Sequence, residues 1–319
     1  MLFCMALGLR AALNQKTQTS DLRPLSIMQT IKRELNEDGV LIKETWMCDG
    51  QVHRTDGPAV QELHPDGTPH AEEWLQNGEW HRTDGPAVQE WCPDGTLLRE
   101  AWFQGKQFHR TDGPARQEWL PDGTLSREVW YRDNLEHRTD GPAVQELHPD
   151  GTPRFEEWYL HGKIHRTDGP ARQGWLPDGT PRVEEWFQNE EWHRTDGPAV
   201  QEWCPDGTLV AEAWFQGKQF HRTDGPARKE WLPDGTLFIE DWYLHGKIHR
   251  TDGPARQRWL PDGTLLREAW FLDGKETSQR EVILTRVRAK VLRSSHLLIF
   301  ASAVQCVSTD SLSVIGGFM

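Results

Sequence analysis

Basic residues are in the minority in this chain of 319 residues, and this excludes some partners. Lysine and arginine total 36, against 49 aspartates and glutamates, so the formal net charge is −13. A charge of this sign repels nucleic acid and anionic lipid headgroups, which argues against both as partners. A basic protein partner fits the charge better.

Long hydrophobic runs are missing too. The run from Leu297 to Val304 is far shorter than the ~20 apolar residues that cross a bilayer. The run from Leu2 to Leu9 follows no basic segment and makes a poor secretion signal. Both observations favour a cytoplasmic protein without a membrane anchor.

Cysteine is scarce, with five residues in all. Cys92 and Cys204 occupy the same position of a repeated unit, four units apart. If each unit adds two strands, the two thiols lie roughly 40 Å apart, beyond the reach of a disulfide. The sequence therefore predicts no disulfide framework and a reducing compartment.

Signatures of catalysis and of cofactor binding are also missing. The sequence has no nucleophile elbow, no phosphate-binding loop and no His/Cys spacing typical of a metal site. Asp94-Gly95-Thr96 lacks the alternating oxygen ligands of a calcium loop. We expect a non-enzymatic protein with no catalytic residues, no metal and no cofactor.

What the sequence does have is a repeat. The heptapeptide His-Arg-Thr-Asp-Gly-Pro-Ala occurs eight times at intervals of 28 residues, from His53 to His249. Such a period predicts a tandem-repeat architecture. It divides the chain into a non-repeat segment for which disorder is one alternative (1–27), a degenerate capping repeat (28–52), eight repeats (53–276) and a non-repeat tail (277–319). Residues 280–300 could form a basic amphipathic helix, but a poorly ordered or docked tail is the favoured interpretation.

Each repeat predicts two antiparallel strands and a second, shorter hairpin. In the unit from His81 to Phe108, Asp94-Gly95 separates two extended stretches, and Gln104-Gly105 marks another turn. Asp-Gly between such stretches is a strong hairpin signal, and no stretch has room for an ordinary helix. We expect an all-β fold in which hairpin repeats form one elongated antiparallel sheet.

A two-residue loop at Asp94-Gly95 would fix the register of the hairpin. It predicts the pairs Gln89–Glu100, Ala87–Trp102 and Trp91–Leu98. It also predicts Phe103 opposite Phe108, Tyr159 opposite Ile164 and Phe187 opposite Trp192 on the reverse face. With about 20 to 25° of twist per strand, the sheet should coil through roughly one turn.

Tryptophan is the residue that the repeat concentrates, at one position in each strand of the hairpin. Because residues two apart share a sheet face, we expect these indoles to form an interaction face. The candidate binding residues are Trp91, Trp102, Trp119, Trp130, Trp158, Trp175, Trp186, Trp203, Trp214, Trp231, Trp242 and Trp259.

Polar positions of the repeat have structural interpretations. A glutamate two before each second-strand Trp should bond a cross-strand Gln, with Lys229 as the exception. The heptapeptide His should stack on Trp, and its Arg should pair with carboxylates or cover a ring. In Thr-Asp-Gly-Pro, Asp should bond the backbone two residues on, and Gly should supply a positive φ.

The pattern resembles the MORN-repeat group, and in particular its variant repeats of bacterial and viral proteins. The resemblance is carried by Trp-Tyr-Leu-His-Gly-Lys-Ile-His-Arg (242–250), Asp-Gly-Pro-Ala (252–255) and Trp-Leu-Pro-Asp-Gly-Thr (259–264), and it recurs in all eight units. It implies a hairpin per repeat in an elongated sheet, and a binding or scaffolding role. The 28-residue period is longer than that of a typical MORN unit.

Three functions follow as expectations. The first is a protein–protein interaction scaffold that uses its aromatic-rich face. The second, suggested by the family resemblance, is an antitoxin-like inhibitor that occludes a partner toxin. The third is a carbohydrate binder that uses Trp platforms.

Overall fold

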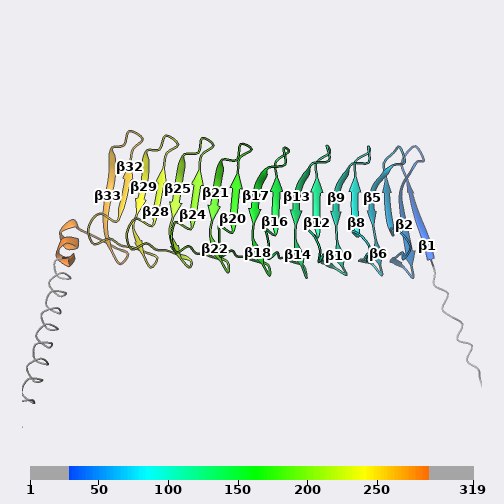
Figure 1. Ribbon diagram of the computed structural model, residues 1–319, viewed down its shortest axis with the longest axis horizontal. Coiled ribbons are helices and arrows are strands. Elements are labelled where there is room, and N and C mark those ends of the chain that lie inside the picture. The colour runs from blue at the N-terminus through cyan, green and yellow to red at the C-terminus, as the bar shows by residue number, and fades with distance from the viewer. Residues whose placement is uncertain (1–28, 287–319) are drawn as a thin grey trace, which may run out of the picture.

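The computed structural model describes residues 29–286, which form one elongated, almost entirely β array (Figure 1). Twenty strands make a single antiparallel sheet, and seven further two-stranded pieces accompany it. The predicted fold of tandem β-hairpin repeats is confirmed. The predicted segment 1–27, and the part of the predicted tail and basic helix beyond residue 286, lie outside the described residues.

Two long strands from each unit build the sheet as a simple meander, β1–β2–β4–β5–β8–β9 and onward to β33. The first strands are β1 (Gln29–Leu35), β4 (Val60–Leu63), β8 (Val88–Trp91), β12 (Arg116–Trp119), β16 (Val144–Leu147), β20 (Arg172–Trp175), β24 (Val200–Trp203), β28 (Arg228–Trp231) and β32 (Arg256–Trp259). The second strands are β2 (Leu41–Cys48), β5 (Pro69–Glu73), β9 (Leu97–Ala101), β13 (Leu125–Val129), β17 (Pro153–Glu157), β21 (Pro181–Glu185), β25 (Leu209–Ala213), β29 (Leu237–Asp241) and β33 (Leu265–Leu272).

Short hairpins follow the second strands and line one long edge of the array (Figure 1). Their strands are β6 (Leu75–Gln76), β7 (Glu79–Trp80), β10 (Phe103–Gln104), β11 (Gln107–Phe108), β14 (Tyr131–Arg132), β15 (Leu135–Glu136), β18 (Tyr159–Leu160), β19 (Lys163–Ile164), β22 (Phe187–Gln188), β23 (Glu191–Trp192), β26 (Phe215–Gln216), β27 (Gln219–Phe220), β30 (Tyr243–Leu244) and β31 (Lys247–Ile248). At the ends, β3 (Gln51–Val52) pairs with β2, and β34 (Lys275–Thr277) pairs with β33. A short helix occupies residues 279–286.

The long hairpin turn differs from the prediction. The N–H of Cys92 donates to the carbonyl of Thr96 at 2.8 Å, so three residues form the loop instead of two. Gly95 adopts φ 86°, and Oδ1 of Asp94 accepts the N–H of Thr96 at 2.9 Å, which stabilises the turn. The predicted turn is therefore in the right place, but it is one residue longer.

A β-bulge next to this turn corrects the register. Trp91 pairs with Leu97 instead of the predicted Leu98, and the register shifts by one residue before the next pair. Gln89 consequently faces Glu100, as predicted. The paired ladder stops at Val88 and Ala101, so the expected pairing of Ala87 with Trp102 does not extend it.

The heptapeptide alanine joins neighbouring units. In the second full unit, the N–H of Ala87 donates to Ala101 at 2.9 Å, and its carbonyl accepts the N–H of Trp74 at 2.7 Å. The side chain at this position has no room to be larger, because it is completely buried in every unit. These alanines are Ala59, Ala87, Ala115, Ala143, Ala171, Ala199, Ala227 and Ala255, each 0% exposed.

The short hairpins carry stacked rings, and the three predicted reverse-face pairs of the short hairpins are confirmed. The longest stack has five rings with neighbouring centroids 4.5 to 5.5 Å apart. Such spacing suits aromatic stacking. The five are Phe187, Trp192, Phe215, Phe220 and Tyr243.

The array is less coiled than the twist per strand predicts. In Figure 1 the long strands keep similar directions from β2 to β33 and do not turn through a full circle. Extended flat sheets are typically stabilised by specific side-chain ladders. The stacked rings of the short hairpins, and the polar rows described below, are ladders of this kind.

Candidate functional site

Every second-strand indole from Trp46 to Trp242 is covered by a heptapeptide arginine. The guanidinium carbon lies 3.8 to 4.2 Å from the ring centroid in all eight cases. This is cation–π geometry. The predicted role of Arg as a ring cover is confirmed. The predicted stacking of His on Trp is wrong, because Arg occupies that place.

Four groups hold Arg138, which illustrates how these arginines are fixed. Nε of Arg138 donates to Asp140 at 3.0 Å, and one terminal nitrogen donates to the carbonyl of Pro142 at 3.3 Å. The same nitrogen lies 3.7 Å from a carboxylate oxygen of Glu128. Together with the ring of Trp130, these contacts fix the guanidinium.

The heptapeptide glycine makes room for this arginine. A Cβ on Gly141 would lie 2.7 Å from Cζ of Arg138, closer than real side chains approach. The φ of Gly141 lies outside the left-handed region. The expectation of a positive φ is therefore wrong for this glycine. This glycine instead allows the arginine side chain to approach the backbone closely. The glycines with positive φ lie in the two hairpin turns.

The ring of the heptapeptide histidine bonds the backbone of the short hairpin that follows it. Nδ1 of His137 accepts the N–H of His161 at 3.0 Å, and the two imidazole rings lie 4.4 Å apart. Burial, followed by the neighbouring imidazole, lowers the pKa of His137. His221 and His245 repeat this arrangement, and the pKa of His221 is lowered by the same causes. A neutral ring is required, because only the unprotonated nitrogen accepts the bond.

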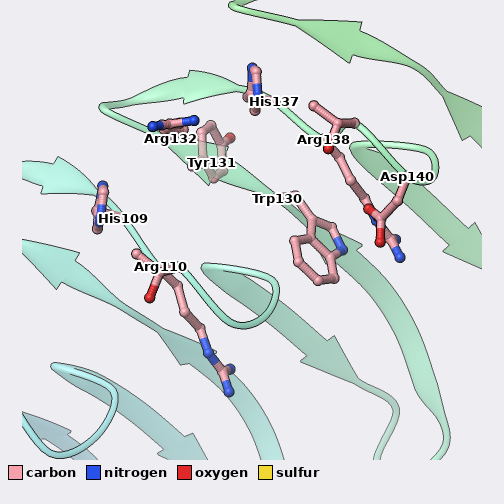
Figure 2. Close-up of a pocket in the computed structure, with 10 residues that line it drawn as sticks. His109, Arg110, Trp130, Tyr131, Arg132, His137, Arg138 and Asp140 are labelled. Carbon is pink, nitrogen blue, oxygen red and sulfur yellow. The ribbon is translucent and has the colours of Figure 1, made fainter.

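Successive heptapeptides enclose a groove. The largest has a volume of about 550 Å³ and is open to solvent on the sheet face that carries the covered indoles. Figure 2 shows Trp130 between the two neighbouring segments, with the guanidinium of Arg138 beside it and Tyr131 and Arg132 on the other side. His109 and Arg110 of the preceding unit complete the lining. Equivalent grooves of about 460, 450 and 280 Å³ contain Trp102, Trp214 and Trp242.

An exposed aspartate stands at the rim of these grooves in each unit. The side chain of Asp140 is 78% exposed although one oxygen bonds Arg138. That hydrogen bond, with the arginine charge, lowers the pKa of Asp140. Equivalent aspartates are 53 to 81% exposed, and they are Asp56, Asp84, Asp112, Asp168, Asp196, Asp224 and Asp252. The grooves therefore run beside a row of ionised carboxylates.

A row of alternating Glu and Gln crosses the whole sheet between the grooves and the long turns. Each Gln faces one Glu of its own unit and one of the preceding unit, as Gln89 faces Glu100 and Glu72. The predicted amide-to-carboxylate bond forms at Gln61–Glu72 (3.2 Å) and Gln145–Glu156 (3.1 Å). In three other units the Glu accepts from indole Nε1, as Glu100 accepts from Trp102 at 3.3 Å.

Lys229 replaces Gln in this row. Its ammonium lies 3.6 Å from Glu212, and Glu240 flanks it on the other side. The row therefore accepts a cation between two carboxylates.

The structure has a hollow on the reverse face that the sequence did not predict. Gly174 stands where six other units have Glu, and it is buried between Phe155 and Val183. The hollow has a volume of about 570 Å³, and Trp175 and Trp203 also line it. The sequence shows that Gly174 replaces Glu at this position of the repeat. The sheet face on which the hollow lies could be assigned only once the strand register was known.

The twelve candidate indoles thus fall into two rows at different heights on the strands. All are partly buried. The second-strand row, under its arginines, consists of Trp102, Trp130, Trp158, Trp186, Trp214 and Trp242. The first-strand row, beside the long turns, consists of Trp91, Trp119, Trp175, Trp203, Trp231 and Trp259.

Among residues 29–286, no three His, Cys, Asp or Glu side chains are grouped so that they could hold a metal ion. Within the same residues, no helix is both long and apolar enough to span a bilayer.

Comparisons with known proteins give little further information. No family model matches the sequence, and no curated protein matches it. Among solved structures, a chain of the Photorhabdus luminescens Tc holotoxin pore matches at 11% identity and a TM-score of 0.12, covering 76% of this chain and 16% of that one. A chain of the TcdB2–TccC3–Cdc42 complex matches at 12% identity and a TM-score of 0.11, covering 72% and 13%. This chain thus spans less than a fifth of each, and similarity this low carries no argument about fold or function.

Proposed function

We propose that this protein is a non-enzymatic repeat protein that binds an extended segment of a basic partner protein along its grooves. The observation that carries the proposal is the succession of open grooves with one exposed carboxylate per unit, such as Asp112 and Asp140. Identical sites in series favour a long partner, since each site adds to the binding of one chain. A catalytic site would instead need one distinctive pocket.

The spacing of the carboxylates specifies the partner further. Two strands per unit place successive rim aspartates roughly 9.6 Å apart. A segment in the extended polyproline II conformation advances about 3.1 Å per residue with three residues per turn, so every third side chain points the same way and meets a carboxylate. A segment with Lys or Arg at every third position is therefore the best match.

The covered indoles support a peptide more than a sugar. One face of each second-strand Trp from Trp46 to Trp242 is already occupied by a guanidinium, as Arg110 occupies that of Trp102 at 4.1 Å. A carbohydrate platform needs that face bare. The arginine leaves the groove with polar walls that can bond peptide groups.

A labelled peptide of repeated Lys-Ser-Gly tests the proposal by fluorescence anisotropy at low salt. Changing the rim residues Asp112, Asp140, Asp168 and Asp196 together to Asn should weaken binding at least tenfold. The matched control changes Asp94, Asp122, Asp150 and Asp178, at the long turns on the opposite edge, to Asn. Each variant loses four negative charges, and each new Asn keeps a side-chain oxygen that can accept a hydrogen bond.

Equal losses of peptide affinity in the two variants would mean that only the net charge matters, and would refute binding in the groove. A peptide of the same composition with its lysines adjacent should bind more weakly than the spaced one. If it bound as well, the spacing argument would be wrong.

A further inference from the structure

The sheet ends in two edge strands. One is a first strand of the repeat and the other is a second strand. The first, β1, is a first strand whose outer side has no neighbour in residues 29–286. At the other end is β33, a second strand. Its lower half pairs with β34, while residues 265–268 are exposed. An unpaired strand edge is a template for another chain.

Junctions between full units always use three residue pairs. Where β29 meets β32, the pairs are Ile239–Arg258, Glu240–Gln257 and Asp241–Arg256. The remaining junctions between full units have the same form. The geometry needed to add one more first strand to β33 is thus known from the chain itself.

The register of β1 can be placed on this pattern. Arg33 faces Glu44 from one side as Gln61 does from the other, so Arg33 holds the Gln position of the repeat. Glu268 holds the Glu position of the last unit, because it faces Gln257. If β1 of a second copy lay beside β33, Glu268 would face Arg33.

The neighbouring pair is complementary too. Glu34 and Glu62 both face Lys43, and Arg267 faces Arg258, so the same register sets Arg267 opposite Glu34. Opposite charges directly across a strand pair stabilise the pairing, and like charges destabilise it. Both charged pairs of the junction are of opposite sign.

The groups concerned are available. The side chain of Arg33 is 61% exposed, although it bonds Glu44 at 2.6 Å. Glu268 is exposed and has no hydrogen bond or ion pair within residues 29–286, unlike most other members of its row. A cation between two carboxylates already occurs in this row at Lys229.

We propose that a second copy of this chain docks head to tail, its β1 pairing with β33 to continue the sheet across the two molecules. The contact joins different surfaces of the two copies and therefore does not close on itself, so it generates open linear assemblies. The grooves and the Glu/Gln row would then run on from one copy to the next. This inference does not depend on the proposed function.

Sedimentation velocity of the full chain over a wide concentration range tests the junction. The wild-type protein should form progressively longer species as concentration rises, and added salt should shift them toward monomer because the pairs are exposed. Glu268→Arg, which opposes Arg33, should remain monomeric at concentrations where the wild type assembles. The triple variant Arg33→Glu, Glu44→Arg, Glu268→Arg should restore assembly, since the pair across the junction is then reversed while β1 and β2 keep opposite charges at positions 33 and 44.

Glu202→Arg is the matched control, because it makes the same charge change at an exposed position within the sheet. It should assemble as the wild type does, and circular dichroism should show all variants folded. A wild-type protein that stays monomeric at every concentration would overturn the proposal. So would a Glu268→Arg variant that assembles like the wild type, or a triple variant that stays monomeric.

Discussion

The close approach of the heptapeptide glycine to its arginine predicts an unusual outcome for a small substitution. Gly141→Ala would place a Cβ 2.7 Å from Cζ of Arg138, so the guanidinium has to move off Trp130. The backbone itself tolerates alanine, since its φ lies outside the left-handed region. The cost therefore comes entirely from the displaced arginine.

The magnitude follows from the contacts that are lost. A partly buried cation–π contact contributes about 0.5 to 2 kcal/mol. The hydrogen bond from Arg138 to the carbonyl of Pro142 contributes about 0.5 to 1.5 kcal/mol more. Alanine returns about 0.4 to 1 kcal/mol by restricting the unfolded chain. The variant should lose about 1.5 kcal/mol, the middle of a range of about 0 to 3 kcal/mol, which corresponds to a Tm lowered by about 3 to 6 °C.

The assay is a double-mutant cycle with Arg138→Ala, followed by thermal and urea denaturation. Once the arginine is gone, Gly141→Ala has nothing to displace and should be neutral or slightly stabilising. The substitution should therefore change sign between the two backgrounds. If Gly141→Ala destabilised both backgrounds equally, backbone strain would be the cause, and the close-approach explanation would be refuted.

Three further predictions concern single contacts. Burial and the neighbouring imidazole lower the pKa of His137, so as the pH falls the unfolded chain is protonated at this residue before the folded chain is. Stability should therefore fall as the pH drops through the ordinary histidine range near ~6.5. His161→Asn should reduce the difference in Tm between neutral and acidic pH. Gly174→Glu should lower stability by about 1 to 3 kcal/mol, since its Cβ would lie 3.0 Å from Val183, and adding Val183→Ala should recover part of the loss in urea denaturation. Phe215→Ala interrupts the five-ring stack and should cost about 2 kcal/mol, with faster amide exchange in the two adjoining short hairpins; unchanged exchange there would show that the stack does not join the units.

Much of the fold was predictable because turn residues and strand alternation repeat without interruption. The pairing of Gln89 with Glu100 was predicted correctly even though the turn size was not. The loop has one residue more than expected, and the bulge at Trp91 and Leu97 compensates for it. The bulge depends on local backbone geometry, and the residues at these positions give no sequence signal for it.

The candidate site was less predictable. His109 and Arg110 are adjacent, and both can cover an indole, so the sequence could not decide which of them lies on Trp102. In the structure the long side chain of arginine reaches across the turn onto the ring, while the imidazole accepts a backbone N–H or faces a side chain of the short hairpin that follows. The role of Gly113 follows from this choice and could not be inferred before it.

The constancy of the junction has a consequence for the length of the protein. Since each full unit meets the next through three backbone pairs of the same form, removing or adding a whole unit keeps the pairing pattern of every junction. The units from His81 to Phe108 and from His193 to Phe220 differ only at positions 98/210 and 99/211, so exchanging one for the other alters two side chains. The length of the array can therefore change in steps of roughly 9.6 Å without loss of its backbone pairing.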